Sequence, residues 1–182
     1  MFFSRQYKIG AVPILFLNIK EIKDATQVVM DLLGEYTNAP RNELPIDPIL
    51  YSYLHGRFDS MQRQHYVHLY GSDKPKRIDF RYGGSNPVVM EFAVRPPTGG
   101  AQLTAKQNLT ELRKLCRVTR NEAKLRSLLL IDLYWKPQDK EKLKMAYDLE
   151  HAGPGKFERH PVRVIYVHKQ ETFDFSWSPY KG

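Results

Sequence analysis

The sequence is poor in cysteine, because Cys116 is the only one among 182 residues. A single thiol excludes an internal disulfide and a zinc site built on several cysteines. Cys116 lies close to Leu112 and Leu115 in a stretch with helical spacing, so we interpret it as a small buried residue and not as a nucleophile. The six histidines show no spacing typical of a zinc site either.

Long apolar runs are also missing. The most apolar stretch covers residues 11–19, which is too short to span a bilayer and contains Pro13. No small-residue cleavage site follows it, so it matches a signal peptide poorly. We interpret it as a buried N-terminal segment, and we predict a cytoplasmic protein with no membrane partner.

Two common catalytic motifs are absent as well. The glycines of YGGSNP (82–87) lack the strand-to-helix context and the Lys-Ser/Thr pair of a phosphate-binding loop. No Gly-x-Ser-x-Gly elbow for a nucleophilic serine occurs. These absences argue against nucleotide binding through such a loop and against a serine hydrolase of that type.

What the chain has in excess is positive charge. Its formal net charge is +8, with basic clusters at 74–77, 113–126 and 140–144. Such a surplus suits a polyanionic partner such as nucleic acid, because binding releases counterions from the phosphates. A solvated basic surface without such a partner is the alternative interpretation.

Helical spacing and short runs of β-branched and aromatic residues alternate along the chain. The predicted elements are helices over 24–36 (capped by Asp24) and 47–58, strands over 64–70, 77–82 and 87–94, a helix over 103–118, a strand over 127–135, a helix over 137–155 and a strand over 162–169. Short links join the first three strands, which therefore form an antiparallel meander, and a helix before the fourth strand predicts a parallel crossover.

This order predicts an α/β fold with a mixed central β-sheet, in which a three-strand antiparallel meander and a parallel βαβ crossover are flanked by helices. No repeat or linker supports a second domain, so residues 1–182 are predicted to form one domain. We interpret the aromatic ending, 173–182, as a strap over the core at Phe173 and Phe175. The roles of Trp177 and Tyr180 stay open.

Two neighbouring predicted strands each carry one acid, Asp79 in RIDFRY and Glu91 in VMEFAVR. Because side chains alternate along a strand, Ile78, Phe80 and Tyr82 should share one face and Asp79 should lie on the other. The same alternation separates Glu91 from its apolar neighbours. If the strands pair with their apolar faces together, both acids are forced onto the same side of the sheet.

Two like charges at that distance repel, so a positive group should lie between the acids. A divalent cation such as Mg²⁺ is one candidate, because it binds one or two carboxylates and keeps several waters. A salt bridge to Arg77, Arg81 or Arg95 is the other candidate. The residue types alone leave both interpretations open.

The element order, with an Asp in the second strand and a Glu in the third, resembles the PD-(D/E)XK nuclease superfamily and its restriction-endonuclease-like fold. The family motif is an Asp, a variable gap and then Glu-x-Lys, and here it reads Asp79 followed by Glu91-Phe92-Ala93. The resemblance covers about residues 47–135. Residues 1–46 would form an N-terminal helical extension, and residues 136–182 a C-terminal helix, strand and aromatic strap.

The resemblance implies a nuclease that hydrolyses phosphodiester bonds in DNA with Mg²⁺ or Mn²⁺ as cofactor. Asp79 and Glu91 would ligate the metal, and the backbone carbonyl of Phe92 would be a further ligand. The metal would activate the attacking water and neutralise charge on the phosphate. RNA is the alternative substrate. A homodimer is compatible, because many members of the superfamily cut one strand with each protomer.

Ala93 stands where the family motif has its lysine, so either the cation has moved or the activity is lost. Lys106 and Lys114, on the helix that follows the third strand, could reach back to the acids, and we favour Lys106. Arg95 lies on the same strand face and is a second candidate for a catalytic cation, although arginine is a poor proton acceptor because it stays charged.

Several further residues are predicted to contact nucleic acid, and Gln107 among them is similar to a helix glutamine in some branches of the superfamily. The full set is Lys74, Lys76, Arg77, Arg81, Gln107, Arg113 and Lys114. Outside it, we interpret His68 as structural, and Asp132 as a cap of the sheet edge, as a partner of a helix arginine or as a site residue.

Two rival hypotheses remain. The chain could be an inactive nuclease-fold protein that binds nucleic acid or inhibits a protein partner, or an unrelated α/β interaction module whose acids form salt bridges.

Overall fold

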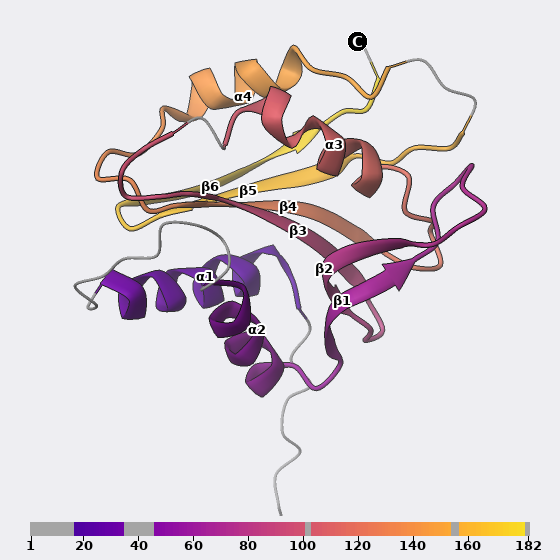
Figure 1. Ribbon diagram of the computed structural model, residues 1–182, viewed down its shortest axis with the longest axis horizontal. Coiled ribbons are helices and arrows are strands. Elements are labelled where there is room, and N and C mark those ends of the chain that lie inside the picture. The colour runs from indigo at the N-terminus through magenta and orange to yellow at the C-terminus, as the bar shows by residue number, and fades with distance from the viewer. Residues whose placement is uncertain (1–16, 35–45, 101–102, 154–156, 181–182) are drawn as a thin grey trace, which may run out of the picture.

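The computed structural model describes residues 17–34, 46–100, 103–153 and 157–180. Along these residues two helices precede a run of three strands, and a helix, a strand, a helix and two strands follow (Figure 1). The helices are α1 (Ile19–Gly34), α2 (Ile46–Arg57), α3 (Ala105–Leu115) and α4 (Lys140–Asp148), and the strands are β1 (Met61–Val67), β2 (Lys76–Tyr82), β3 (Val88–Arg95), β4 (Leu125–Asp132), β5 (Val162–His168) and β6 (Glu171–Trp177).

The strands form one mixed sheet of six, in the order β1-β2-β3-β4-β5-β6. β1, β2 and β3 are antiparallel neighbours, β3, β4 and β5 are parallel, and β6 returns antiparallel to β5. Helices α1 and α2 cover one face of the sheet, and α3 and α4 cover the other (Figure 1). The predicted α/β class, with a meander joined to a parallel crossover, is confirmed.

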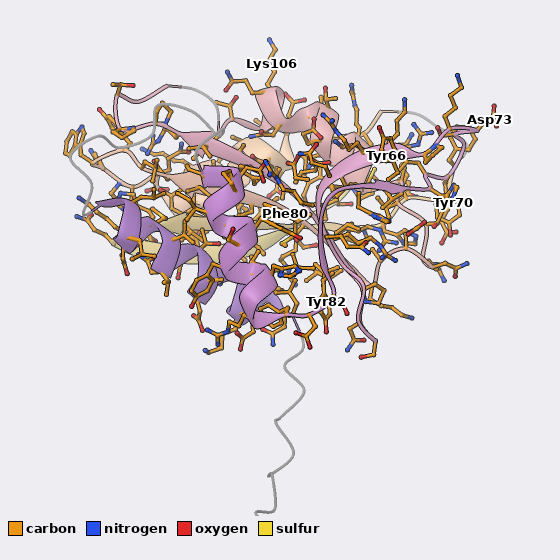
Figure 2. All side chains as sticks on the ribbon, turned by 60° about the horizontal axis from the view of Figure 1, so that its bottom comes forward. Tyr66, Tyr70, Asp73, Phe80, Tyr82 and Lys106 are labelled. Atoms are coloured by element: carbon orange, nitrogen blue, oxygen red, sulfur yellow. The ribbon has the colours of Figure 1, made fainter. Side chains whose placement is uncertain are left out.

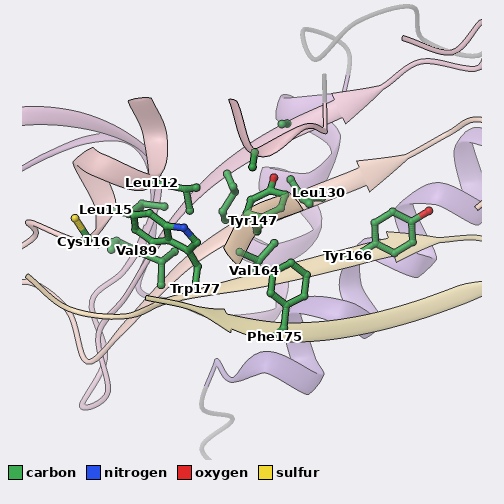
Figure 3. Packing of buried hydrophobic residues seen from close by; sticks show 14 of the residues in the cluster. Val89, Leu112, Leu115, Cys116, Leu130, Tyr147, Val164, Tyr166, Phe175 and Trp177 are labelled. Atoms are coloured by element: carbon green, nitrogen blue, oxygen red, sulfur yellow. The ribbon is translucent and has the colours of Figure 1, made fainter. Parts of the chain in front are cut away.

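The sheet separates two hydrophobic clusters. The α3–α4 cluster, part of which Figure 3 shows, includes Val89, Leu112, Leu128, Leu130, Tyr147, Val164, Phe175 and Trp177. The α1–α2 cluster includes Ile22, Leu50, Phe80, Met90, Leu129, Ile131 and Ile165. Consecutive residues of β4 alternate between the clusters. This strand is therefore covered on both faces, as its nearly continuous apolar sequence predicts.

The first helix begins earlier than its sequence pattern predicts. α1 starts at Ile19, and the side-chain oxygen of Asn18 accepts a 3.1 Å hydrogen bond from the backbone N–H of Glu21. Asp24 therefore lies inside the helix, where it pairs with Lys20 at 2.6 Å, and it is not the N-cap. The predicted end of this helix at residue 36 and most of the predicted buried segment, 11–16, lie outside the described residues.

The aromatic ending forms a strand, which the sequence analysis did not predict. Phe173, Phe175 and Trp177 alternate along β6 and are buried in the α3–α4 cluster. The indole N–H of Trp177 donates a 2.8 Å hydrogen bond to the carbonyl of Glu150. The segment thus covers the core as a paired edge strand. Tyr180 lies beyond it and is exposed.

Across the described ranges, no helix is both long and apolar enough to cross a membrane.

Candidate functional site

The site lies where β2 and β3 separate. β2 pairs with β1 from Lys76 to Tyr82 except at Asp79, but its pairing with β3 covers only Phe80–Tyr82 against Val88–Met90. One further step in this register brings Asp79 opposite Glu91. There, the backbone N–H of Phe92 donates to Oδ2 of Asp79 at 3.2 Å. The carboxylate of Asp79 therefore takes the place of a backbone carbonyl of β2 as the next hydrogen-bond acceptor. It lies in the gap between the strands.

A backbone distortion in β1 lies directly across from Asp79. Gln64 falls between the paired residues Arg63 and His65 and has a φ of 55°, which is uncommon for a residue other than glycine. Backbone strain of this kind concentrates at functional sites, where the surrounding structure must enforce it. The distortion therefore marks this part of the sheet as a candidate site independently of the acids.

The side-chain alternation of β2 changes phase at the same place. Phe80 packs in the α1–α2 cluster, where its ring stacks on that of Phe92 at 5.5 Å, whereas Ile78 packs in the α3–α4 cluster. The prediction that Ile78, Phe80 and Tyr82 share one face is wrong for Ile78. Simple alternation assumes a regular strand, and the distortion next to Asp79 breaks that regularity.

Glu91 is buried beneath α3 and paired with a lysine. Val89 and Ala93, two positions before and after Glu91 on the same face of β3, belong to the α3–α4 cluster. Only 3% of Glu91 is exposed. The ammonium of Lys114, in the last turn of α3, forms a salt bridge with Oε1 of Glu91. Neither acid is held by an arginine among the ion pairs of the described residues.

Lys114 ties three elements together at this point. Besides Glu91 on β3, its Nζ lies 2.5 Å from Oε2 of Glu111, one turn earlier on α3. It also donates a 3.2 Å hydrogen bond to the backbone carbonyl of Arg77 on β2. Lys114 therefore spans the gap between β2 and β3 from the α3 side, in contact with Glu91.

The electrostatics of the two acids are coupled. Burial, followed by the hydrogen bond and the charge of Asp79, raises the pKa of Glu91 to about 10, against the charge of Lys114, which acts in the opposite direction. For Lys114, burial lowers the pKa, but the carboxylates of Glu91 and Glu111 outweigh it and the pKa is raised. A site with this balance favours additional positive charge, either as a proton or as a cation.

The start of helix α3 and the side that it buries together place Lys114 next to Glu91. Thr104 is the N-cap, and its side chain accepts a 3.4 Å hydrogen bond from the N–H of Gln107. Leu112 and Leu115 bury the sheet-facing side of the helix. Glu111 lies three residues before Lys114, so both side chains project from the same part of the helix surface.

Lys106 does not take part in this site. It lies in the first turn of α3, exposed, eight positions before Lys114, which is about 12 Å along a helix axis. Figure 2 shows its side chain extending outward from the helix. Gln107 is also exposed and belongs to the helix cap. The preference for Lys106 is therefore corrected to Lys114, because it is the last turn of α3, not the first, that lies over the acids.

Arg95 is engaged elsewhere. Its guanidinium binds both carboxylate oxygens of Asp132, which is fully buried, and it donates to the carbonyl of Lys136 at 2.8 Å. The hydroxyl of Tyr166 donates to the same carboxylate at 2.5 Å. This network joins the ends of β3, β4 and β5, so the predicted catalytic cation Arg95 is a structural partner of Asp132.

The predicted nucleic-acid contacts fall into distinct environments. Lys74, Lys76 and Arg77 are exposed on the β1–β2 hairpin, and Arg113 is exposed on α3. Arg81 is half-buried and lies 3.6 Å from Glu122, so it is already paired. His68 is exposed beyond the end of β1, and no interaction of its ring with the acids occurs in the part of the chain that the structure describes.

The donor set suits only a particular class of metal site. The described residues contain no group of three or more His, Cys, Asp or Glu side chains that could hold a metal ion. A site that needs four protein ligands, such as structural zinc, is therefore a poor fit here. Two converging carboxylates do fit Mg²⁺ or Mn²⁺, which complete their coordination with water and substrate oxygens.

Comparison with known proteins adds no further information: no family model, no curated protein and no solved structure matches the chain.

Two residues of this site were missed in the sequence analysis. Glu111 carried a usable signal, because an acid three positions before a candidate lysine on a helix shares its surface. Gln64 carried none, since nothing in MQRQHYV indicates a positive φ at its centre.

Proposed function

We propose that the chain is a divalent-metal-dependent nuclease that hydrolyses phosphodiester bonds in DNA. The observation that carries the proposal is the meeting of Asp79 and Glu91 where β2 and β3 separate, with Lys114 beside them. The order of the surrounding elements and these acids resemble the PD-(D/E)XK superfamily. The formal net charge of +8 is consistent with a nucleic-acid substrate.

Asp79 and Glu91 would hold Mg²⁺ or Mn²⁺. When bound, the metal would lower the pKa of a ligating water and offset charge on the phosphate. The upward shift of the pKa of Glu91, caused by burial and by Asp79, is consistent with a carboxyl pair that lacks a sufficient counter-charge. Glu111 lies on the far side of Lys114 and would hold that ammonium when Glu91 turns to another cation.

Lys114 takes the part that the resemblance assigns to the motif lysine, which Ala93 replaces. It reaches Glu91 from the following helix instead of from β3 itself. A raised pKa keeps its ammonium charged at neutral pH. A charged ammonium in this position can donate hydrogen bonds to the attacking water or to a non-bridging phosphate oxygen and so stabilise the transition state.

The test is degradation of plasmid and linear DNA with Mg²⁺ or Mn²⁺. Asp79→Asn and Glu91→Gln should reduce cleavage to background, and Lys114→Met should lower its rate by roughly 100-fold or more. Lys106→Met is the matched control, because this lysine lies on the same helix but away from the acids. Cleavage that survives in Glu91→Gln, or that Lys106→Met abolishes equally, would contradict the assignment.

One observation favours a second function, that of an inactive nuclease-fold protein which binds nucleic acid or inhibits a protein partner. The charge of Lys114 already compensates part of the charge of Glu91, so this acid has a partner without a metal. This alternative predicts a DNA mobility shift that weakens steeply with salt, no cleavage, and no effect of a chelator. Calorimetric titration of Mn²⁺ into wild type and Glu91→Gln separates the two functions before any substrate is chosen.

A further inference from the structure

The hairpin formed by β1, β2 and their connection lies next to the acid site and projects from the sheet (Figure 1). The start of its connection is fixed to the segment that follows α3. The N–H of Tyr70 donates to the carbonyl of Arg117 at 2.8 Å, and the N–H of Thr119 donates to the carbonyl of His68 at 3.1 Å. The guanidinium of Arg117 donates back to the carbonyls of Tyr70 and Gly71, each at 2.9 Å. The hairpin is therefore held in a defined position relative to α3.

An aromatic ring is exposed on this hairpin. Tyr66 is 60% exposed, and it follows the alternation that buries its neighbour Val67 in the α3–α4 cluster. In the register of β1 and β2 it lies directly across from Arg77. No hydrogen bond or ring contact of the Tyr66 side chain occurs among the residues described. Figure 2 shows Tyr66 on the hairpin, with Asp73 near its tip.

The same hairpin carries unpaired positive charge. Lys74, Lys76 and Arg77 are all exposed, and within the described ranges none of their side chains forms an ion pair. Asp73 is the only acid between Gly71 and Arg77. An exposed aromatic ring among unpaired cations is the combination that single-stranded nucleic acids recognise, through base stacking and phosphate contacts.

The hairpin leads directly to the acids. Arg77 lies two residues before Asp79 on β2, and its carbonyl accepts the hydrogen bond of Lys114, which contacts Glu91. A strand bound along the hairpin would therefore lie beside the part of β2 that carries Asp79.

We propose that the β1–β2 hairpin binds single-stranded nucleic acid. Tyr66 stacks on an unpaired base, while Lys74, Lys76 and Arg77 contact the flanking phosphates. The preference for a single strand follows from stacking, because a base inside a duplex has both of its faces covered by neighbours. The inference rests on the proposed function only for the fate of the bound strand, which would be cut at Asp79 and Glu91.

The experiment measures binding by fluorescence anisotropy of a labelled oligothymidine and of a blunt DNA duplex of equal length. Excess EDTA prevents cleavage. Tyr66→Ala should weaken oligothymidine binding by roughly 5- to 100-fold, the usual effect of removing one stacking ring. Tyr66→Phe should retain the affinity, and duplex binding should change little in both variants. Tyr180→Ala is the control, because Tyr180 is also exposed, at 53%, but lies outside the hairpin.

Two results overturn the inference: unchanged oligothymidine affinity in Tyr66→Ala, or an equal loss for oligothymidine and duplex. Circular dichroism confirms that each variant is folded. Cleavage with Mn²⁺ is measured separately on the same proteins. If binding depends on Tyr66 but no cleavage occurs, the inference stands and the proposed nuclease function is contradicted. If cleavage occurs but binding does not depend on Tyr66, the proposed function stands and the inference is contradicted.

Discussion

At the scale of single residues, the central feature is a carboxyl group whose ionisation is opposed both by burial and by a nearby like charge. Glu91 is almost fully buried, and Asp79 approaches it across the gap between β2 and β3. Lys114 compensates part of this cost by its charge. Folding therefore maintains an arrangement that is unfavourable without a cation, which is typical of residues kept for function.

The first prediction concerns the stability of Glu91→Gln in EDTA. The pKa of Glu91 is raised in the folded state to about 10, so the folded protein binds this proton more tightly than the unfolded chain does. The stability that Glu91 contributes is therefore complete below its unfolded pKa and is lost as the pH rises toward 10. Glutamine does not titrate. The free energy of unfolding of the variant minus that of the wild type should therefore rise by about 1 kcal/mol or more between about pH 5 and about pH 8.

Urea unfolding at both pH values measures this difference. Glu111→Gln is the control, because its side chain is about one-third exposed and contacts the same lysine. A stability difference for Glu91→Gln that does not vary with pH would mean that Glu91 is charged in the folded protein throughout this range.

At the scale of elements, α3 decides which lysine reaches the acids. Its first turn is fixed by the Thr104 cap, and its last turn lies over β3 and β2 through Lys114. The direction of the helix follows from the parallel crossover between β3 and β4, which carries the chain back across the sheet. Lys106 and Lys114 are thus placed at opposite ends of one element.

The prediction at this scale is that Thr104→Ala destabilises the protein by about 1 kcal/mol, the usual cost of losing an N-cap. The lost contact is the 3.4 Å hydrogen bond from the N–H of Gln107. Thermal or urea unfolding measures the change. Thr110→Ala is the matched control, since Thr110 is exposed within the same helix and should change stability by less than about 0.5 kcal/mol. Equal effects of the two substitutions would contradict the assigned cap.

At the scale of the whole molecule, one sheet carries both the core and the candidate site. The parallel strands β3, β4 and β5 have helices on both faces, and β6 closes one edge. The opposite edge is the β1–β2 hairpin, where the sheet opens at Asp79. The helix-covered part of the sheet thus lies on one side of the site, and the exposed basic hairpin lies on the other.

The two tryptophans test the place of β6 in this architecture. Trp177 is fully buried in the α3–α4 cluster, whereas Trp135 is 66% exposed in the segment after β4. In Trp135→Phe, the remaining emission should be blue-shifted and shielded from iodide. In Trp177→Phe, the remaining emission should be readily quenched. Equal quenching in the two variants would mean that the C-terminal aromatic segment does not pair with β5.

Much of the fold could be predicted because its signals are local. Alternation, helical spacing and the short links after the first three strands define the meander and the crossover without knowledge of distant contacts. The last strand escaped prediction because FDFSW has the composition of a strap as much as of a strand. Pairing with β5 decided between them.

The sequence by itself placed Asp79 and Glu91 on adjacent strands, because both the strand pattern and the length of the link are written in neighbouring residues. Only the tertiary structure selected Lys114 over Lys106, engaged Arg95 with Asp132, and opened β2 from β3 beside the distorted Gln64. These outcomes depend on how segments that are distant in the sequence pack against one another. A side chain's partner is chosen by the distance that packing creates, and local sequence patterns do not contain that distance.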